Sequence, residues 1–237
     1  MAAPALESLP IVVVDAFASR PFTGNPAAVV DFGDAPFAAD AVLQSIASEN
    51  NLAETAFVRV VDAASARFHL RWFTPEHEIN LCGHATLATA HALFESGVVT
   101  SGAHTLTFDS LSGPLTVARL ADGALQLDFP AWMPTEVAVA DVPDAVLGAF
   151  GLVASDVVWA GKNRDWTIVL RGGPAAVRAL AVDLRALDRI DDAIVVIVAA
   201  VGDGSAHLLA PSSVAPDFVC RAFCPRCSVP EDPVCGR

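Results

Sequence analysis

The sequence consists of two successive stretches of short β-rich runs and helical segments, separated by the proline-bracketed segment 130–134 (PAWMP). In each stretch, runs of β-branched and aromatic residues bounded by Gly, Pro, Asp or Asn predict strands. Apolar residues at three- and four-residue spacing predict helices between them. This pattern predicts an α+β fold in two halves, which we place at residues 1–127 and 128–237.

The expected elements can be placed along the chain. In the first half, helices are expected at 38–50 and 85–95, with Gly97 as the stop of the second. Strands are expected there at 11–17, 27–30, 55–61, 67–73, 105–108, 115–120 and 125–129. In the second half, we expect helices at 143–150 and 174–187, and strands at 157–160, 166–170, 193–201, 206–210 and 219–223.

The composition excludes several classes of protein. Of 237 residues, 54% are hydrophobic and only 17% are charged, which is incompatible with a disordered chain. Acidic residues outnumber basic ones by 27 to 14, giving a net charge of −13, and no basic patch is visible. We therefore expect no nucleic-acid partner and no binding to an anionic membrane.

The N-terminus and the cysteines bear on the compartment. The first residues carry no basic segment ahead of an apolar run, so no secretory signal is predicted. The most apolar run, 193–201, is far shorter than the roughly 20 residues that span a bilayer. The 5 cysteines are odd in number and mostly crowded between 220 and 235. We expect reduced thiols and a cytoplasmic protein.

The segment 71–95 (RWFTPEHEINLCGHATLATAHALFE) is the most informative for chemistry. A strand gives way to a turn, and Gly83 opens a helix whose free N–H groups and positive dipole suit a substrate carboxylate. At such a start, His84 stays neutral and can donate or accept a hydrogen bond. The alternative is an ordinary buried helix with a histidine that only caps or fills the core.

Acidic residues provide further candidates. Glu54 lies among apolar neighbours in NNLAETAFV, where a carboxyl group is protonated more easily and suits proton transfer near neutral pH. Alternatively, Glu54 is an ordinary glutamate that faces solvent on an edge strand. Glu49 is the other candidate acid nearby, and we expect it to be exposed. Glu231 and Asp232 are predicted in a proline-flanked turn before Cys235-Gly236. Such acids are either simply solvated or orient a substrate amine or hydroxyl.

The cysteines leave two further interpretations open. Cys220, Cys224 and Cys227, with Cys235 as a fourth ligand, could hold zinc, but only the CPRC pair has a conventional spacing. We therefore predict no metal site. Cys82 and Cys235 could instead act as the two bases of a racemase, one thiol on each face of a Cα–H bond.

Five motifs follow one another along the chain: DAFASRPFTGNPAAVV (15–30), NNLAETAFV (50–58), RWFTPEHEINLCGHATLATAHAL (71–93), LDFPA (127–131) and EDPVCG (231–236). Together they resemble the pattern of the phenazine-biosynthesis PhzF-like isomerases. That family shares the diaminopimelate epimerase fold. The resemblance implies two pseudo-symmetric halves, each a curved β-sheet or barrel around a central helix. It implies an active site in the cleft between the halves and proton transfer without cofactor or metal. The founding activity isomerises a dihydro-hydroxyanthranilate.

The resemblance also assigns roles. The proton shuttle of the family falls on Glu54, the histidine of its GH motif on His84, and the aspartate of its EDP motif on Asp232. Backbone amides near Gly83 and Gly236 would hold the carboxylate of a small acid. The positions expected to bind substrate are Cys82, Gly83, Ala85, Gly236 and Asn25. A homodimer is a further expectation.

The resemblance weakens at the C-terminal end. After EDPVCG, Arg237 stands where the family has a serine. We therefore expect the second half to be incomplete, without its central helix and final strands. This expectation leaves open a third hypothesis, an inactive truncated paralogue that acts as a binding protein.

Overall fold

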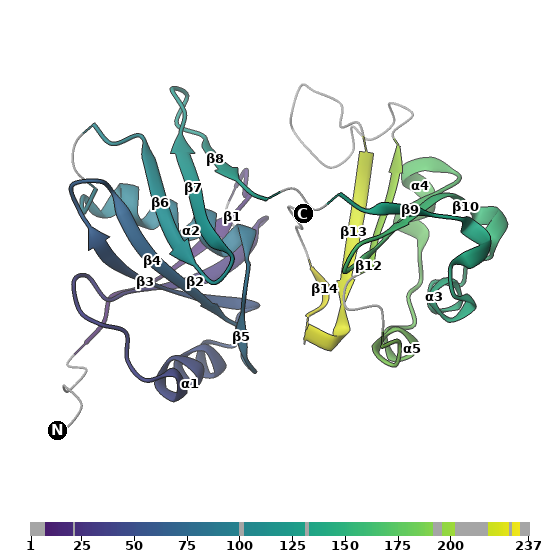
Figure 1. The fold of residues 1–237 in the computed structure, drawn as a ribbon, viewed down its shortest axis with the longest axis horizontal. Coiled ribbons are helices and arrows are strands. Elements are labelled where there is room, and N and C mark those ends of the chain that lie inside the picture. Colours follow the sequence, from purple (N-terminus) through teal and green to yellow (C-terminus); the bar gives the residue numbers. More distant parts are fainter. Residues whose placement is uncertain are drawn as a thin grey trace. The chain divides into compact units, whose positions relative to one another are not determined.

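The computed structural model describes residues 8–20, 22–99, 102–130, 133–191, 196–201, 218–227 and 229–232. The chain divides into two compact units, one containing the described residues up to Pro130 and the other those from Met133 to Asp232 (Figure 1). Within the described ranges, no helix combines the length and the hydropathy that crossing a membrane requires.

The first unit is built on an 8-stranded mixed sheet in the order β1-β2-β3-β4-β6-β7-β8, with β5 paired to β4. Neighbours pair antiparallel except β2 with β3 and β4 with β6, which are parallel. Its strands are β1 Ile11–Ala16, β2 Asn25–Asp31, β3 Glu54–Asp62, β4 Arg67–Phe73, β5 Glu78–Ile79, β6 Thr105–Ser110, β7 Gly113–Arg119 and β8 Leu125–Asp128. Its helices are α1 Asp40–Asn50 and α2 Gly83–Ser96.

Helix α2 is the centre of the first unit. It packs against β1 and β2 and also against β8, which ends the sheet order on the opposite side, so the sheet curves around the helix (Figure 1). Ala85, Ala88 and Ala90 are almost completely buried on it. Small side chains of this kind let a helix approach the surrounding strands closely. Gly97 ends the helix in the left-handed conformation (φ 76°), as predicted.

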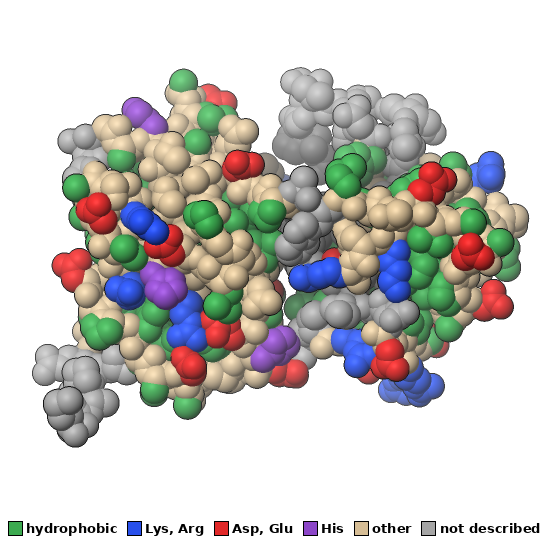
Figure 2. Space-filling view, viewed as in Figure 1, with side chains coloured by type: hydrophobic (Ala, Val, Ile, Leu, Met, Phe, Trp, Pro, Cys, Tyr) green, Lys and Arg blue, Asp and Glu red, His purple; other side chains and the backbone are tan. Residues whose placement is uncertain are grey.

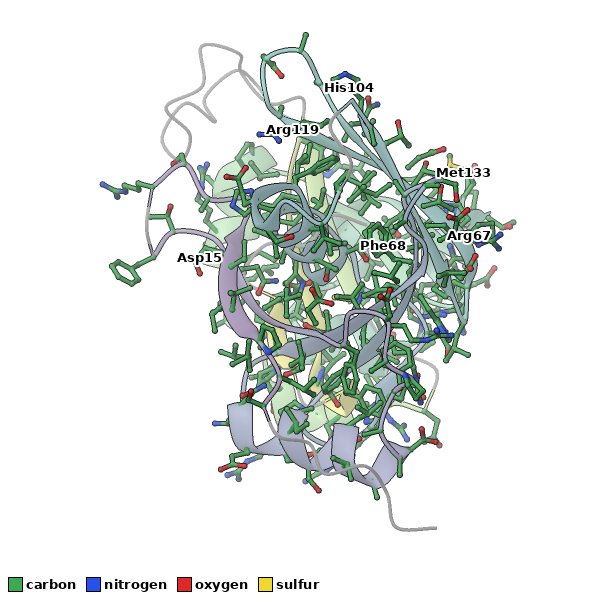
Figure 3. The ribbon with its side chains drawn as sticks, turned by 90° about the vertical axis from the view of Figure 1, so that its left-hand side faces the viewer. Asp15, Arg67, Phe68, His104, Arg119 and Met133 are labelled. Carbon is green, nitrogen blue, oxygen red and sulfur yellow. The ribbon has the colours of Figure 1, made fainter. Side chains whose placement is uncertain are left out.

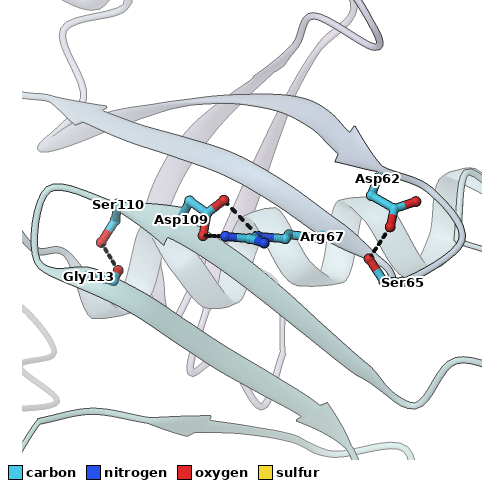
Figure 4. A network of polar contacts seen from close by, with 6 residues as sticks. All are labelled: Asp62, Ser65, Arg67, Asp109, Ser110 and Gly113. Carbon is cyan, nitrogen blue, oxygen red and sulfur yellow. Dashed lines mark hydrogen bonds and ion pairs between the residues drawn. The ribbon is translucent and has the colours of Figure 1, made fainter.

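The strands alternate between this core and the solvent. Phe68 on β4 points into the unit, whereas the adjacent Arg67 points outward (Figure 3). On the outer side, Arg67 donates hydrogen bonds to Asp109 on β6 from two of its guanidinium nitrogens, Nε and Nη2, at 2.9 Å each (Figure 4). Charged side chains of both signs are interspersed on this surface (Figure 2).

The second unit is built on a 6-stranded sheet in the order β14-β13-β12-β11-β10-β9, and among its described strands only β11 and β12 pair in parallel. Its strands are β9 Thr135–Val137, β10 Val157–Lys162, β11 Trp166–Leu170, β12 Val196–Val201, β13 Phe218–Cys224 and β14 Val229–Asp232. Its helices are η1 Val139–Asp141, α3 Asp144–Ala149, η2 Ala154–Asp156, α4 Gly173–Ala179, α5 Leu184–Asp188 and η4 Pro225–Cys227. Helix α4 packs against β11, β12 and β13.

The α+β class is confirmed, and two local predictions are wrong. The single helix expected over 174–187 is two helices, because the Asp183 side chain accepts hydrogen bonds from Arg185 N and Ala186 N and starts α5. Glu231 and Asp232 lie on strand β14 rather than in a turn, since β14 pairs with β13. The short strands β5 and β9 were not predicted. The strand expected at 206–210, together with Cys235 and Gly236, lies outside the described residues.

Candidate active site

Glu54, His84 and Cys82 meet at one end of the first unit. Glu54 opens β3, Cys82 is the last residue before α2, and His84 is the second residue of that helix. The His84 Nε2 atom lies 3.1 Å from Glu54 Oε2, and its Nδ1 atom lies 3.5 Å from Cys82 Sγ. The imidazole therefore lies between a carboxyl group and a thiol, one at each ring nitrogen.

This cluster is shielded from water. The His84 side chain is 6% exposed and that of Glu54 is 12% exposed. The facing atoms Oε2 and Nε2 are buried, and within the described part of the chain neither makes a hydrogen bond of good geometry. Buried polar atoms in such a state are uncommon and indicate a site where a ligand or a proton is handled.

The local sequence explains how Glu54 reaches this place. Helix α1 ends at Asn50, and Asn51 then adopts the left-handed conformation (φ 50°), which turns the chain toward β3. The Asn50 Nδ2 atom donates to Thr55 Oγ1 at 3.2 Å and links the helix end to the strand start. Glu49 is exposed, as predicted.

The start of α2 offers backbone donors to an anion. Cys82 has an extended backbone (φ −144°, ψ 118°), and among the described residues no side chain caps the helix. The first N–H groups of a helix have no partner within it, so those of Gly83, His84 and Ala85 can bind a carboxylate. A Cβ on Gly83 would lie 3.1 Å from Phe129 Cε2, so packing as well as ligand access favours glycine here.

Asn25 lies at the same end of the sheet. It begins β2, which runs parallel to β3 in a register that pairs Ala27 with Glu54. Its side chain is almost fully buried. The preceding Gly24 is required sterically, because a Cβ there would collide with the carbonyl oxygen of Ala16.

Asp232 lies in the second unit, opposite Ala222 across the β13–β14 pair. Burial, and secondarily the charge of Asp232, raises the pKa of the Cys220 thiol above its usual value. The neighbouring Glu231 accepts hydrogen bonds from Arg221 Nε and Nη2 at 2.6 and 2.8 Å. This ion pair between Arg221 on β13 and Glu231 on β14, which the sequence did not suggest, joins the two strands. Arg221 also donates a hydrogen bond to the carbonyl oxygen of Leu180.

The structure thus brings together three of the predicted site residues, Glu54, Cys82 and His84, with Gly83, Ala85 and Asn25 on adjoining backbone. The contact between Cys82 and His84 was not predicted. Its only sequence signal is the spacing C-x-H across a helix start. The catalytic and substrate-binding roles of all these residues, and those of Asp232 and Gly236, remain predictions.

A central helix within a curved mixed sheet, with the Glu54 carboxyl group and His84 at the helix start, is the α+β arrangement expected for the diaminopimelate epimerase fold. The family model "Phenazine biosynthesis-like protein" matches residues 14–237, and the chain belongs to this family. An uncharacterized isomerase of Pseudomonas aeruginosa is 44% identical over 223 residues, which cover 94% of this chain and 76% of the relative.

Solved structures agree with this assignment. A phenazine biosynthesis protein of the PhzF family from Enterococcus faecalis is 41% identical, with a TM-score of 0.79 over 96% of this chain and 78% of that one. A structure described as a predicted epimerase from Pseudomonas aeruginosa is 27% identical, with a TM-score of 0.58 over 81% of this chain and 70% of that one. The family resemblance and the epimerase-like fold are confirmed.

Proposed function

We propose that the protein is an isomerase that moves a proton within a small carboxylic acid, without a cofactor or a metal, and that Glu54 is the general acid and base. The observation that carries this proposal is the buried approach of Glu54 Oε2 to His84 Nε2 at 3.1 Å, beside an uncapped helix start. The isomerases and PhzF-family proteins among its relatives support the reaction class.

In this mechanism the substrate carboxylate binds the N–H groups at the start of α2, as an anion does at a helix N-terminus. The Glu54 carboxylate takes a proton as a C–H bond of the substrate breaks. The resulting anion is delocalised toward the bound carboxylate, and Glu54 returns the proton to a different carbon. His84 orients the Glu54 carboxyl group and hydrogen-bonds the substrate. We also assign Asp232 and the backbone of Gly236 to substrate binding, the role that the family resemblance implies for them.

A thiol-dependent racemase is the second candidate function. The observation that favours it is the 3.5 Å distance between Cys82 Sγ and His84 Nδ1, since an imidazole can accept the proton of a thiol. Cys82 and Cys235 would then act on opposite faces of the substrate Cα–H. A cytoplasmic location and a homodimer also stay predictions.

Incorporation of solvent deuterium into a 2,3-dihydro-3-hydroxyanthranilate-like acid tests the proposal. Glu54→Gln should lower the exchange rate by the roughly 10²- to 10⁴-fold that a general acid or base contributes. The matched control is Glu49→Gln, an exposed glutamate near the end of α1, which should exchange at the unchanged rate. Full activity of Glu54→Gln would refute the role of Glu54, and full activity of Cys82→Ser would exclude the racemase.

A further inference from the structure

The contacts around His84 allow a second use of the same three side chains. Glu54, Cys82 and His84 each offer one ligand atom, and these atoms all lie within 4.8 Å of one another. Cys82 and His84 are buried and Glu54 is nearly so, in contrast to the solvated acidic clusters common on protein surfaces.

From this geometry we propose that Glu54, Cys82 and His84 form a binding site for one Zn²⁺ ion, or a divalent ion of similar softness, that inhibits the enzyme. Thiolate, imidazole and carboxylate are the three ligand types that zinc takes in proteins. Three protein ligands leave a fourth position for water or a substrate oxygen. Zn²⁺ would inhibit because it would bind Glu54, the proposed general base, so the inhibition rests on the proposed function. The binding of Zn²⁺ does not depend on that function.

The required movement is small. With zinc–ligand bonds of about 2.0–2.3 Å, tetrahedral ligand atoms lie about 3.3–3.8 Å apart. The 3.1 Å between Glu54 Oε2 and His84 Nε2 is already near this range. Because one imidazole nitrogen binds one ion, Cys82 Sγ or the His84 ring must turn toward the shared position. Because the ligand atoms lie within 4.8 Å of one another, this turn has to shorten their separation by no more than about 1.5 Å.

The charge balance also favours a divalent cation. The positive end of the α2 dipole, worth about half an elementary charge, opposes a cation. Two anionic ligands, the Glu54 carboxylate and the Cys82 thiolate, outweigh it. Because Cys82 must lose its proton to bind, the apparent affinity should rise with pH.

Cobalt(II) provides a direct readout, because tetrahedral Co²⁺ with a thiolate ligand absorbs in the near ultraviolet and the visible. The reduced, metal-stripped full chain is titrated with Co²⁺ and then with Zn²⁺. We expect the thiolate-to-cobalt absorption band to saturate at one Co²⁺ ion per chain, bound at Cys82. Zn²⁺ should then abolish the band, because it binds such sites more tightly. Absence of saturable binding would overturn the proposal.

Variants locate the site. Cys82→Ser should lose the near-ultraviolet band, and Glu54→Gln should keep it with affinity weakened by at least the roughly 10- to 100-fold that loss of a supporting partner costs a metal site. The control is the double variant Cys224→Ser/Cys227→Ser, which removes the CPRC thiols and should leave the band intact. A band that survives in Cys82→Ser and vanishes in this control would assign the metal to the CPRC pair and refute the proposal.

Two further readouts keep the interpretation separate from folding and from the proposed reaction. Each variant is checked for a cooperative thermal transition, and if Cys82→Ser fails this check, the weakened affinity of Glu54→Gln decides. Zn²⁺ should inhibit deuterium exchange reversibly, with activity restored by a chelator. If the wild type binds Zn²⁺ at Cys82 but catalyses no exchange, the proposed function fails and the metal site stands.

Discussion

The Nε2 atom of His84, in the first turn of α2, lies 3.1 Å from Oε2 of Glu54, the first residue of β3. Both groups are almost buried, and neither atom makes a well-formed hydrogen bond within the described residues. If this pair acts as a unit, its two members should not contribute independently to catalysis.

The first prediction is therefore a non-additive mutant cycle. Glu54→Gln and His84→Asn should each slow solvent-deuterium exchange by roughly 10²-fold or more. The double variant should be no slower than the slower single variant, because either change already breaks the unit. The exchange rates of the three variants and the wild type check this. Rate losses that multiply in the double variant would mean that the residues act separately.

The second prediction concerns the glycine at the start of α2. In Gly83→Ala the new Cβ meets Phe129 Cε2 at 3.1 Å, which should cost about 1–3 kcal/mol of the free energy of unfolding, as overpacking does. Phe129→Leu in the same chain should recover part of the loss, since it removes the colliding ring edge. Denaturant unfolding of the single and double variants measures both effects.

Gly148 is the matched control for this change. It lies in α3, is exposed, and has open space where its Cβ would be. Gly148→Ala should stabilise the protein by roughly 0.5–1 kcal/mol, because alanine loses less backbone entropy in a helix. If Gly83→Ala is as stable as Gly148→Ala, the packing explanation for Gly83 is wrong.

The third prediction compares two arginines on β4. Arg71 binds Glu78 through two nitrogens at 2.7 Å each and Asp40 at 2.9 Å, so it joins β4, β5 and α1, and its side chain is only 16% exposed. Arg71→Gln should lower the free energy of unfolding by roughly 2 kcal/mol, because it removes buried hydrogen bonds to charged groups. Denaturant unfolding at constant salt measures the change.

Arg67 provides the contrast because its pair with Asp109 has the same fork geometry but lies at the surface, with 52% of the arginine side chain exposed. Exposed pairs of this kind are screened by water and salt. Arg67→Gln should therefore leave the unfolding midpoint unchanged. Equal losses in the two variants would show that burial does not decide the strength of these pairs.

The first unit was predicted well because its signals are local. Strand β4 matches the expected 67–73, since alternation such as that of Arg67 and Phe68 follows directly from the two-residue period of a strand. In the second unit, Glu231 and Asp232 carry the composition of a turn, yet pairing with β13 and the Arg221 ion pair hold them in β14. Tertiary contacts of this kind leave no local pattern.

The same distinction applies to the candidate site. Glu54 and His84 could be selected from their neighbours and from the family motifs. Their approach, and the contact of Cys82 with His84, depend on how α2 packs within the curved sheet. No spacing in the sequence relates position 54 to position 84, so the three-residue cluster could not be predicted from it.

The fourth prediction concerns the thiol beside Asp232. Burial, followed by the negative charge of Asp232, raises the pKa of Cys220, so less thiolate is present at a given pH than for a free cysteine. Because alkylation requires the thiolate, the pH midpoint for iodoacetamide labelling of Cys220 should lie above that of the unfolded chain. Peptide mapping by mass spectrometry follows this cysteine separately from the others.

Asp232→Asn tests the cause of the shift. Removing the charge should move the labelling midpoint of Cys220 down in pH and only part of the way to the unfolded value, because the larger contribution, burial, remains. Asp191→Asn, which neutralises an exposed aspartate paired with Arg226, should leave the midpoint in place. An unchanged midpoint in Asp232→Asn would show that the Asp232 charge does not act on this thiol.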